Sequence, residues 1–240
     1  RTVENELQLP TRFDKFEPET LITGDVFPCI NESILKQLFA EISDHVVKVD
    51  LIRKICENRR TAGWYKRFSN YFDCLFFIGK MQTFYQEHGG GFHIVEPKKT
   101  WNLYTSDLYR MDAYYRHFHY AFGNSLKNAN DILEDGLKHS TEFVEALYQN
   151  WFLRELTACW TNAAADDLAT LGYISEIEKQ RDFYKRYVAP ASSKNTRAFV
   201  IISDALRYEV ASELSERIVR NTKGTAESES MQAILPSTPT

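Results

Sequence analysis

The stretch from residue 197 to 209 constrains the fold of this chain more than any other part. Within it, residues 198–203 form an almost unbroken apolar run that is rich in β-branched side chains. An unbroken run, unlike an alternating one, is typical of a strand that is buried on both faces of a parallel sheet. The run stops at Asp204, and apolar residues then recur every four positions from Val210 to Ile218, as in an amphipathic helix. The stretch therefore predicts a strand, an acidic residue and a helix of an α/β fold.

Two interpretations of Asp204 follow from this position. Aspartate is among the best N-caps, and a strand-to-helix turn needs a cap. A carboxylate at the carboxyl end of a strand also lies where open α/β sheets place their ligands, and it can bind a divalent metal ion. The residues alone leave both interpretations open.

A resemblance favours the second interpretation. The sequence Phe199-Val-Ile-Ile-Ser-Asp204-Ala-Leu-Arg207-Tyr208-Glu209 resembles the opening of the PglZ domain, a branch of the alkaline phosphatase superfamily that occurs in BREX phage-defence systems. Residues 234–240, Ile-Leu-Pro-Ser-Thr-Pro-Thr, resemble the loop after the next strand of that domain. Residues 104–160 resemble the helical region upstream of it. The resemblance implies a mostly α, bundle-like region followed by the first β-α-β unit of an α/β alkaline-phosphatase-like domain.

The resemblance also implies a site. Asp204 corresponds to a metal ligand, and a threonine on the later loop corresponds to the nucleophile. Pro239 stands where an ungapped match places this threonine, so Thr240 and Thr238 are the two candidates, with Thr240 preferred. The implied cofactors are divalent metal ions, Zn²⁺ first and Mg²⁺ or Mn²⁺ next. No histidine follows His139, so the further ligands of a two-metal site are not expected within these residues and the chain alone is expected to be inactive.

The implied function is a metal-dependent phosphatase, phosphodiesterase or nuclease that acts in the cytoplasm against phage DNA. The implied partners are other BREX proteins, such as the DNA methyltransferase, and DNA. The alternative is a non-catalytic scaffold whose helical region docks other BREX components or DNA.

Prolines, glycines and apolar stripes divide the chain into three parts. Residues 1–30 are predicted to be a connector, residues 31–190 an all-helical domain, and residues 197–240 the beginning of the PglZ domain. Residues 189–196 have linker composition. The absence of an initial methionine, and an end inside a motif, favour a piece of a longer polypeptide. The apolar stripes predict six helices, at about residues 31–42, 44–58, 64–88, 101–122, 130–160 and 174–188.

Composition and net charge restrict the functions that the chain can have. A net charge of −4 gives no overall basic surface for nucleic acid, so such binding needs a local patch. One basic cluster comprises Arg59, Arg60, Lys66 and Arg67. Two interpretations of it are a phosphate-binding site and a solvent-exposed joint between two helices. Aromatic residues interleaved with basic ones at 114–122 could stack bases, although helical spacing makes them core residues first. No apolar run is long enough to span a membrane, and the four widely spaced cysteines are predicted to be buried free thiols.

Overall fold

The computed structural model describes residues 2–127, 130–193, 197–204 and 206–233. Two compact units are present, one comprising residues 1–91 and 111–154 and the other residues 92–110 and 155–240. Both units are mostly helical, and the strand pairing of the described residues is limited to one parallel bridge between Lys179 and Gln232. The predicted helical character is thus confirmed, and a β-α-β unit is not formed within the described residues.

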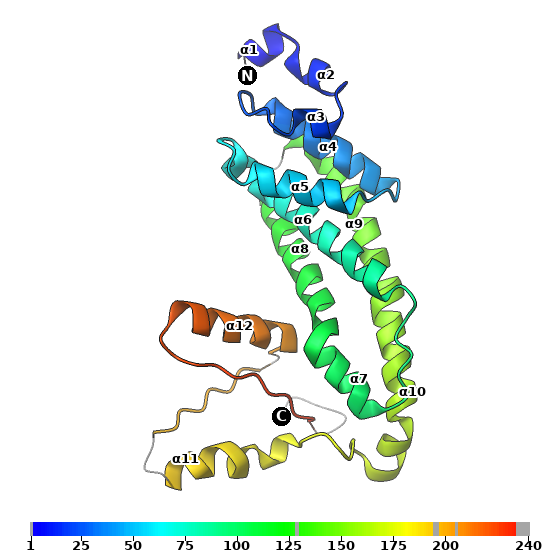
Figure 1. Ribbon diagram of the computed structural model, residues 1–240, viewed down its shortest axis with the longest axis vertical. Coiled ribbons are helices and arrows are strands. Elements are labelled where there is room, and N and C mark those ends of the chain that lie inside the picture. Colours follow the sequence, from blue (N-terminus) through cyan, green and yellow to red (C-terminus); the bar gives the residue numbers. More distant parts are fainter. Residues whose placement is uncertain (1, 128–129, 194–196, 205, 234–240) are drawn as a thin grey trace. The chain divides into compact units, whose positions relative to one another are not determined.

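The first unit is a set of helices of very different lengths (Figure 1). Its elements are α1 (Thr2–Glu6), α2 (Leu9–Phe13), α3 (Pro18–Leu21), α4 (Cys29–Ser43), α5 (Val49–Arg59), α6 (Tyr65–His88), most of α8 (Tyr109–Lys127), α9 (Asp131–Glu145) and the π-helix η2 (Ala146–Leu153). Helix α4 packs against α9, and α5 packs against α6. The first 30 residues, predicted to be a connector, thus contain three short helices, of which α2 and α3 contact α4.

Helices α4 and α9 approach closely at one glycine. A Cβ atom on Gly136 would lie 3.3 Å from the Cβ of Phe39, which is tighter than an ordinary contact. One turn later, the Ser140 hydroxyl donates to the Phe39 carbonyl over 3.3 Å. Helix α9 runs through Gly136 without interruption, from Asp131 to Glu145. This glycine therefore serves close packing.

Asn130 caps helix α9, as the sequence predicted for its start. The Asn130 Oδ1 accepts from the Ile132 amide over 3.0 Å, and the Asn130 Nδ2 donates to Glu32 Oε1 over 2.9 Å. The Asn130 amide donates to the Tyr71 hydroxyl over 3.0 Å. The Asn130 side chain thus caps the helix end and ties it to α4, and its backbone amide ties it to α6.

We expect Asn130→Ala to destabilise α9 by about 1 kcal/mol, because the cap and the link to Glu32 are both lost. Amide hydrogen exchange of peptides from residues 131–145 measures this as faster exchange. Asn58→Ala is the matched control, since Asn58 is exposed in the last turn of α5 and caps no helix. Equal exchange in the two variants would contradict the capping role.

The second unit has a small core of its own. Its elements are α7 (Pro97–Leu103), the π-helix η1 (Tyr104–Leu108), α10 (Arg154–Leu171), the 3₁₀ turn η3 (Gln180–Asp182), the π-helix η4 (Tyr184–Val188), α11 (Ala189–Ser193) and α12 (Tyr208–Asn221). Ala164, Ile174 and Ile177 are buried there, with Trp101 and Trp160 packed against them.

Two predictions for this unit were wrong. Ile174 and Ile177 were assigned to a helix over residues 174–188, but they precede η3 and η4 and lie in an irregular segment that bridges to Gln232. Residues 189–193, given linker composition, form α11. The spacing of the isoleucines did not distinguish a helix from a turn. Two isoleucines three positions apart can lie on one face of a helix, and a turn can also bury both in a core.

The four cysteines agree with their predicted state, and three glycines follow helix α6. All four cysteines are buried free thiols, and burial raises the pKa of Cys56 to about 12. Helix α6 ends at His88, and Gly91 has a φ of 87°, a left-handed conformation that glycine adopts without strain. Within the described residues, no helix has the length and hydropathy needed to cross a membrane.

Candidate functional site

The residues before Asp204 do not form the predicted strand. They form no helix and have no partner strand among the described residues, and their apolar side chains face solvent: Phe199 is 85% exposed and Ile201 and Ile202 are each 91% exposed. A strand is stable only when neighbouring strands pair with its backbone and other elements cover its faces. The sequence contains an apolar run that suits a buried strand, but the described residues do not form the sheet that would bury it.

Asp204 does not cap the helix that follows. Helix α12 begins at Tyr208, and the N-cap position is held by Arg207 with an extended backbone and no side-chain capping bond. Asp204 lies three residues earlier, in an exposed turn. The capping interpretation of Asp204 is therefore wrong.

The described residues do not fit a resident metal ion by themselves. No group of three or more histidine, cysteine, aspartate and glutamate side chains in the described ranges is arranged to hold one. Asp204 supplies one exposed carboxylate, and a metal ion of this class needs three or more protein ligands. Thr238 and Thr240, the two nucleophile candidates, lie outside the described residues.

The chain that leads to these threonines is fixed by one buried glutamine. The Gln232 Oε1 accepts from the Ile174 amide over 2.8 Å, and its Nε2 donates to the carbonyls of Ile174 and Ile177 over 2.6 and 2.5 Å. Its backbone amide also donates to the Glu178 carbonyl over 2.7 Å, and its carbonyl accepts from the Gln180 amide over 2.9 Å. Gln232 is 7% exposed. Residues 231–233 are thereby held against the segment around Ile174.

The start of α12 is fixed by Tyr208. Its hydroxyl donates to the Thr105 carbonyl over 2.9 Å, and its ring packs edge-on to Tyr109 at 5.3 Å. Burial raises the pKa of the Tyr208 phenol, so it stays a neutral donor at physiological pH. Tyr208 thus holds the helix that follows Asp204 against η1.

Sequence reasoning missed the role of Gln232. A single glutamine between Met231 and Ala233 belongs to no motif, and its side-chain partners lie 58 and 55 positions away. Tyr208 was recognised as part of the domain signature, but its contact with Thr105 is equally remote in sequence.

The basic cluster in the first unit divides into one buried and three exposed residues. Arg59 is 1% exposed and donates to the Gly24 and Leu21 carbonyls over 2.6 and 3.4 Å. Arg60, Lys66 and Arg67 are exposed where α5 meets α6. Arg59 is therefore a structural residue, and the other three remain accessible.

The histidines among the interleaved aromatics have different surroundings. The His119 Nε2 lies 3.0 Å from Glu145 Oε1, and the same carboxylate accepts from the Tyr115 hydroxyl over 2.9 Å. His117 instead stacks on Phe77, with ring centroids 5.0 Å apart. The two histidines thus have partners on different faces of α8.

Comparisons with known proteins place these features in a family. Residues 183–240 match the family model described as the BREX system PglZ alkaline phosphatase-like domain. Over 98% of its length the chain is 32% identical to the alkaline phosphatase-like protein PglZ of Bacillus cereus (strain H3081.97). It is 30% identical, again over 98% of its length, to the alkaline phosphatase-like protein BrxZ of Escherichia coli O9:H4 (strain HS).

The similarity covers nearly all of this chain but only part of each relative, because the chain spans 27% of the length of each. No solved structure matches the chain significantly. The Asp204 signature and the segment anchored by Gln232 both lie inside residues 183–240, the range of the family model. Residues 183–240 therefore match the PglZ domain of BREX systems, and the chain as a whole is similar to part of alkaline phosphatase-like proteins named PglZ and BrxZ.

Proposed function

We propose that the protein containing this chain is a metal-dependent hydrolase of phosphate esters or phosphodiesters that acts in BREX defence against phage. The observation that carries the proposal is the match of residues 183–240 to the PglZ domain, with Asp204 directly after its apolar run. Members of the alkaline phosphatase-like superfamily typically depend on metal ions. Asp204 does not cap α12, and its carboxylate is exposed in the described structure.

In this proposal Asp204 is one metal ligand, and Thr240, or else Thr238, is the nucleophile. The remaining ligands belong to the rest of the PglZ domain, because the described residues do not complete a site. Divalent ions, with Zn²⁺ as the first choice and Mg²⁺ or Mn²⁺ as the others, supply charge stabilisation for phosphoryl transfer. The chain's own described residues hold the two motif segments: Tyr208 fixes the helix after Asp204, and Gln232 fixes the segment before the threonines.

The proposed substrates include DNA, and the proposed partners are other BREX components such as the DNA methyltransferase. The alternative is a scaffold whose helical region docks these components without catalysis. The exposed apolar residues Leu214, Ile218 and Val219 on α12 suit either proposal, since they need a covering surface from the same protein or from a partner.

The test is hydrolysis of bis(p-nitrophenyl) phosphate and of DNA by the intact natural protein. We expect turnover that is abolished by EDTA and restored by Zn²⁺, Mg²⁺ or Mn²⁺, because the metal ions neutralise charge that develops on the phosphoryl oxygens. The 240-residue chain alone is expected to show none. Absence of turnover by the intact protein with every ion would favour the scaffold.

A further inference from the structure

A pocket of about 250 Å³ lies in the first unit, between the end of α5, the first half of α6 and the middle of α8. Its aromatic lining comes from Phe76, Phe77, His117 and Tyr120. Phe76 and Phe77 pack edge to face at 5.2 Å, and Phe77 lies parallel to His117 within 11°. Tyr120 is 72% exposed, which is unusual for an aromatic residue in a helix that also contributes to a core. The pocket therefore offers flat apolar walls and one accessible ring.

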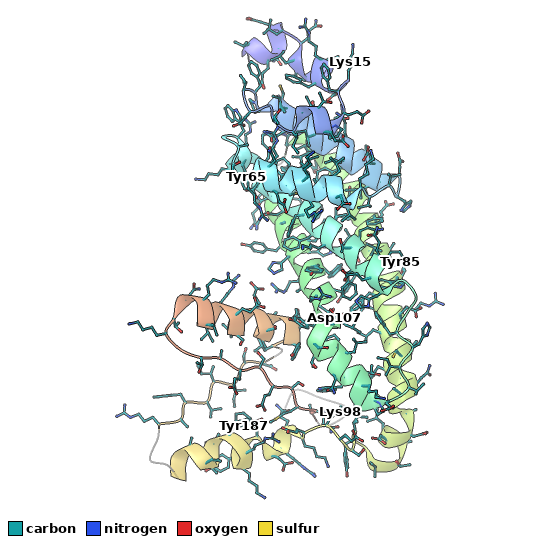
Figure 2. The ribbon with its side chains drawn as sticks, in the orientation of Figure 1. Lys15, Tyr65, Tyr85, Lys98, Asp107 and Tyr187 are labelled. Atoms are coloured by element: carbon teal, nitrogen blue, oxygen red, sulfur yellow. The ribbon has the colours of Figure 1, made fainter. Side chains whose placement is uncertain are left out.

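A guanidinium group, an amide and a carboxylate also line this pocket. The Arg60 guanidinium lies 5.1 Å from the centroid of the Phe76 ring. Asn70 and Asp73 are three positions apart on α6 and so share a face of it. The Tyr65 hydroxyl, at the start of α6 in Figure 2, donates to Asp73 Oδ1 over 3.4 Å. Burial raises the pKa of the Asp73 carboxyl, and Arg60 opposes this effect.

Two further cations lie close to this lining in the chain or in space. Lys66 is exposed one helical turn before Asn70 on α6, and the Lys80 ammonium lies 5.4 Å from the Phe76 ring centroid. Phosphate groups bind to exposed arginine and lysine side chains, and planar bases stack on aromatic rings and guanidinium groups. Carboxylate and amide oxygens accept hydrogen bonds from the amino groups of bases. The pocket brings together all three kinds of contact that a nucleotide requires.

We propose that this pocket binds a nucleotide whose base carries an exocyclic amino group, such as adenine or cytosine. The base stacks on the exposed Tyr120 ring, its amino group donates to Asp73, and its phosphate contacts Arg60. The ligand is either a free nucleotide or one unit of a single-stranded nucleic acid, since both present the same base and phosphate. The site is separate from the residues of the proposed hydrolase, which lie in the second unit.

Binding is measured by fluorescence anisotropy on the intact protein, with EDTA present so that hydrolysis does not contribute. The probes are short labelled oligo(dA), oligo(dC) and oligo(dT), together with unlabelled AMP as a competitor. We expect oligo(dA) and oligo(dC) to bind about tenfold more tightly than oligo(dT), because thymine has no exocyclic amino group. Displacement by AMP would identify a free nucleotide as sufficient, and its failure to displace would identify a single strand as the ligand.

Three variants, two of them with a matched control, test whether the ligand binds in this pocket. Tyr120→Ala is expected to weaken oligo(dA) binding about tenfold through lost stacking, whereas Tyr184→Ala, at another exposed tyrosine, leaves it unchanged. Arg60→Glu is expected to weaken binding and flatten its salt dependence, and Arg12→Glu, at an exposed arginine on α2, is its control. Asp73→Asn is expected to remove most of the preference for oligo(dA) over oligo(dT), because an amide both donates and accepts.

The proposal is overturned if oligo(dT) binds as well as oligo(dA), if the pocket variants match their controls, or if no probe binds at low salt. Because the assay needs no turnover, these results are independent of the hydrolase proposal. Circular dichroism of each variant shows whether the fold is retained, and Tyr120 and Arg60 are exposed enough for substitution without unfolding.

Discussion

Replacing Asp204 with alanine in the intact protein is expected to lower metal-dependent phosphodiester hydrolysis at least about 100-fold. Loss of residues that merely orient a metal ligand already costs tenfold to 100-fold, so loss of a direct ligand costs at least as much. The comparison is of initial rates over a range of metal concentrations. If Asp204 is a ligand, the variant also needs a higher metal concentration for its residual rate.

Asp166→Ala is the matched control, because Asp166 is an exposed aspartate of α10 in the same unit. Asp204 is itself exposed in the described structure, so the change removes no buried contact and its effect on stability is expected within about 0.5 kcal/mol. A loss of rate then reports on the site and not on folding. Equal rates for wild type, Asp204→Ala and Asp166→Ala would remove Asp204 from the proposed metal site.

Gln232→Leu is expected to destabilise the anchored segment by about 3 kcal/mol and to slow hydrolysis as well. The substitution leaves the Ile174 amide and the carbonyls of Ile174 and Ile177 without their side-chain partner in a buried position, and each such group costs about 1–3 kcal/mol. The hydrolytic rate is expected to fall because Thr238 and Thr240 follow residues 231–233 within seven positions of the chain. Hydrogen exchange of peptides covering residues 172–182 and 230–233 measures the local opening.

Gln180→Leu provides the control for this change. Gln180 is exposed, and its backbone amide, not its side chain, bonds to the Gln232 carbonyl. The control is therefore expected to keep the bridge and to exchange as wild type does. Indistinguishable exchange in the two variants would show that Gln232 does not anchor the segment.

Long amphipathic helices could be predicted from the sequence because the apolar pattern that defines each helix lies within its own residues. Helix α6 was predicted at residues 64–88 and occupies Tyr65–His88, since its apolar stripe and the terminal glycines mark both ends. The helix after Asp204 was likewise predicted, and α12 runs from Tyr208 to Asn221. The π-helix η2 was not predicted, because one wide turn shifts hydrogen bonds by a single residue and leaves the apolar pattern nearly intact.

The strand predicted at residues 198–203 is not formed in the described structure. Its backbone groups need hydrogen-bond partners on neighbouring strands, and the only strand pairing among the described residues is the bridge at Gln232. Asp204 could be singled out because the apolar run ends at it. The role of Gln232 and the pocket lined by Arg60 and Tyr120 could not be predicted from the sequence, because the residues that form each of them lie far apart in the chain.

The central claim is that Asp204 is a ligand of a metal centre, and the most direct test is anomalous scattering at the zinc edge from crystals of the intact protein. The account predicts a peak about 2.0–2.2 Å from an Asp204 carboxylate oxygen, with residues 198–203 paired as a strand of a sheet. A metal bound elsewhere, with Asp204 still exposed to solvent while that sheet is formed, would contradict it.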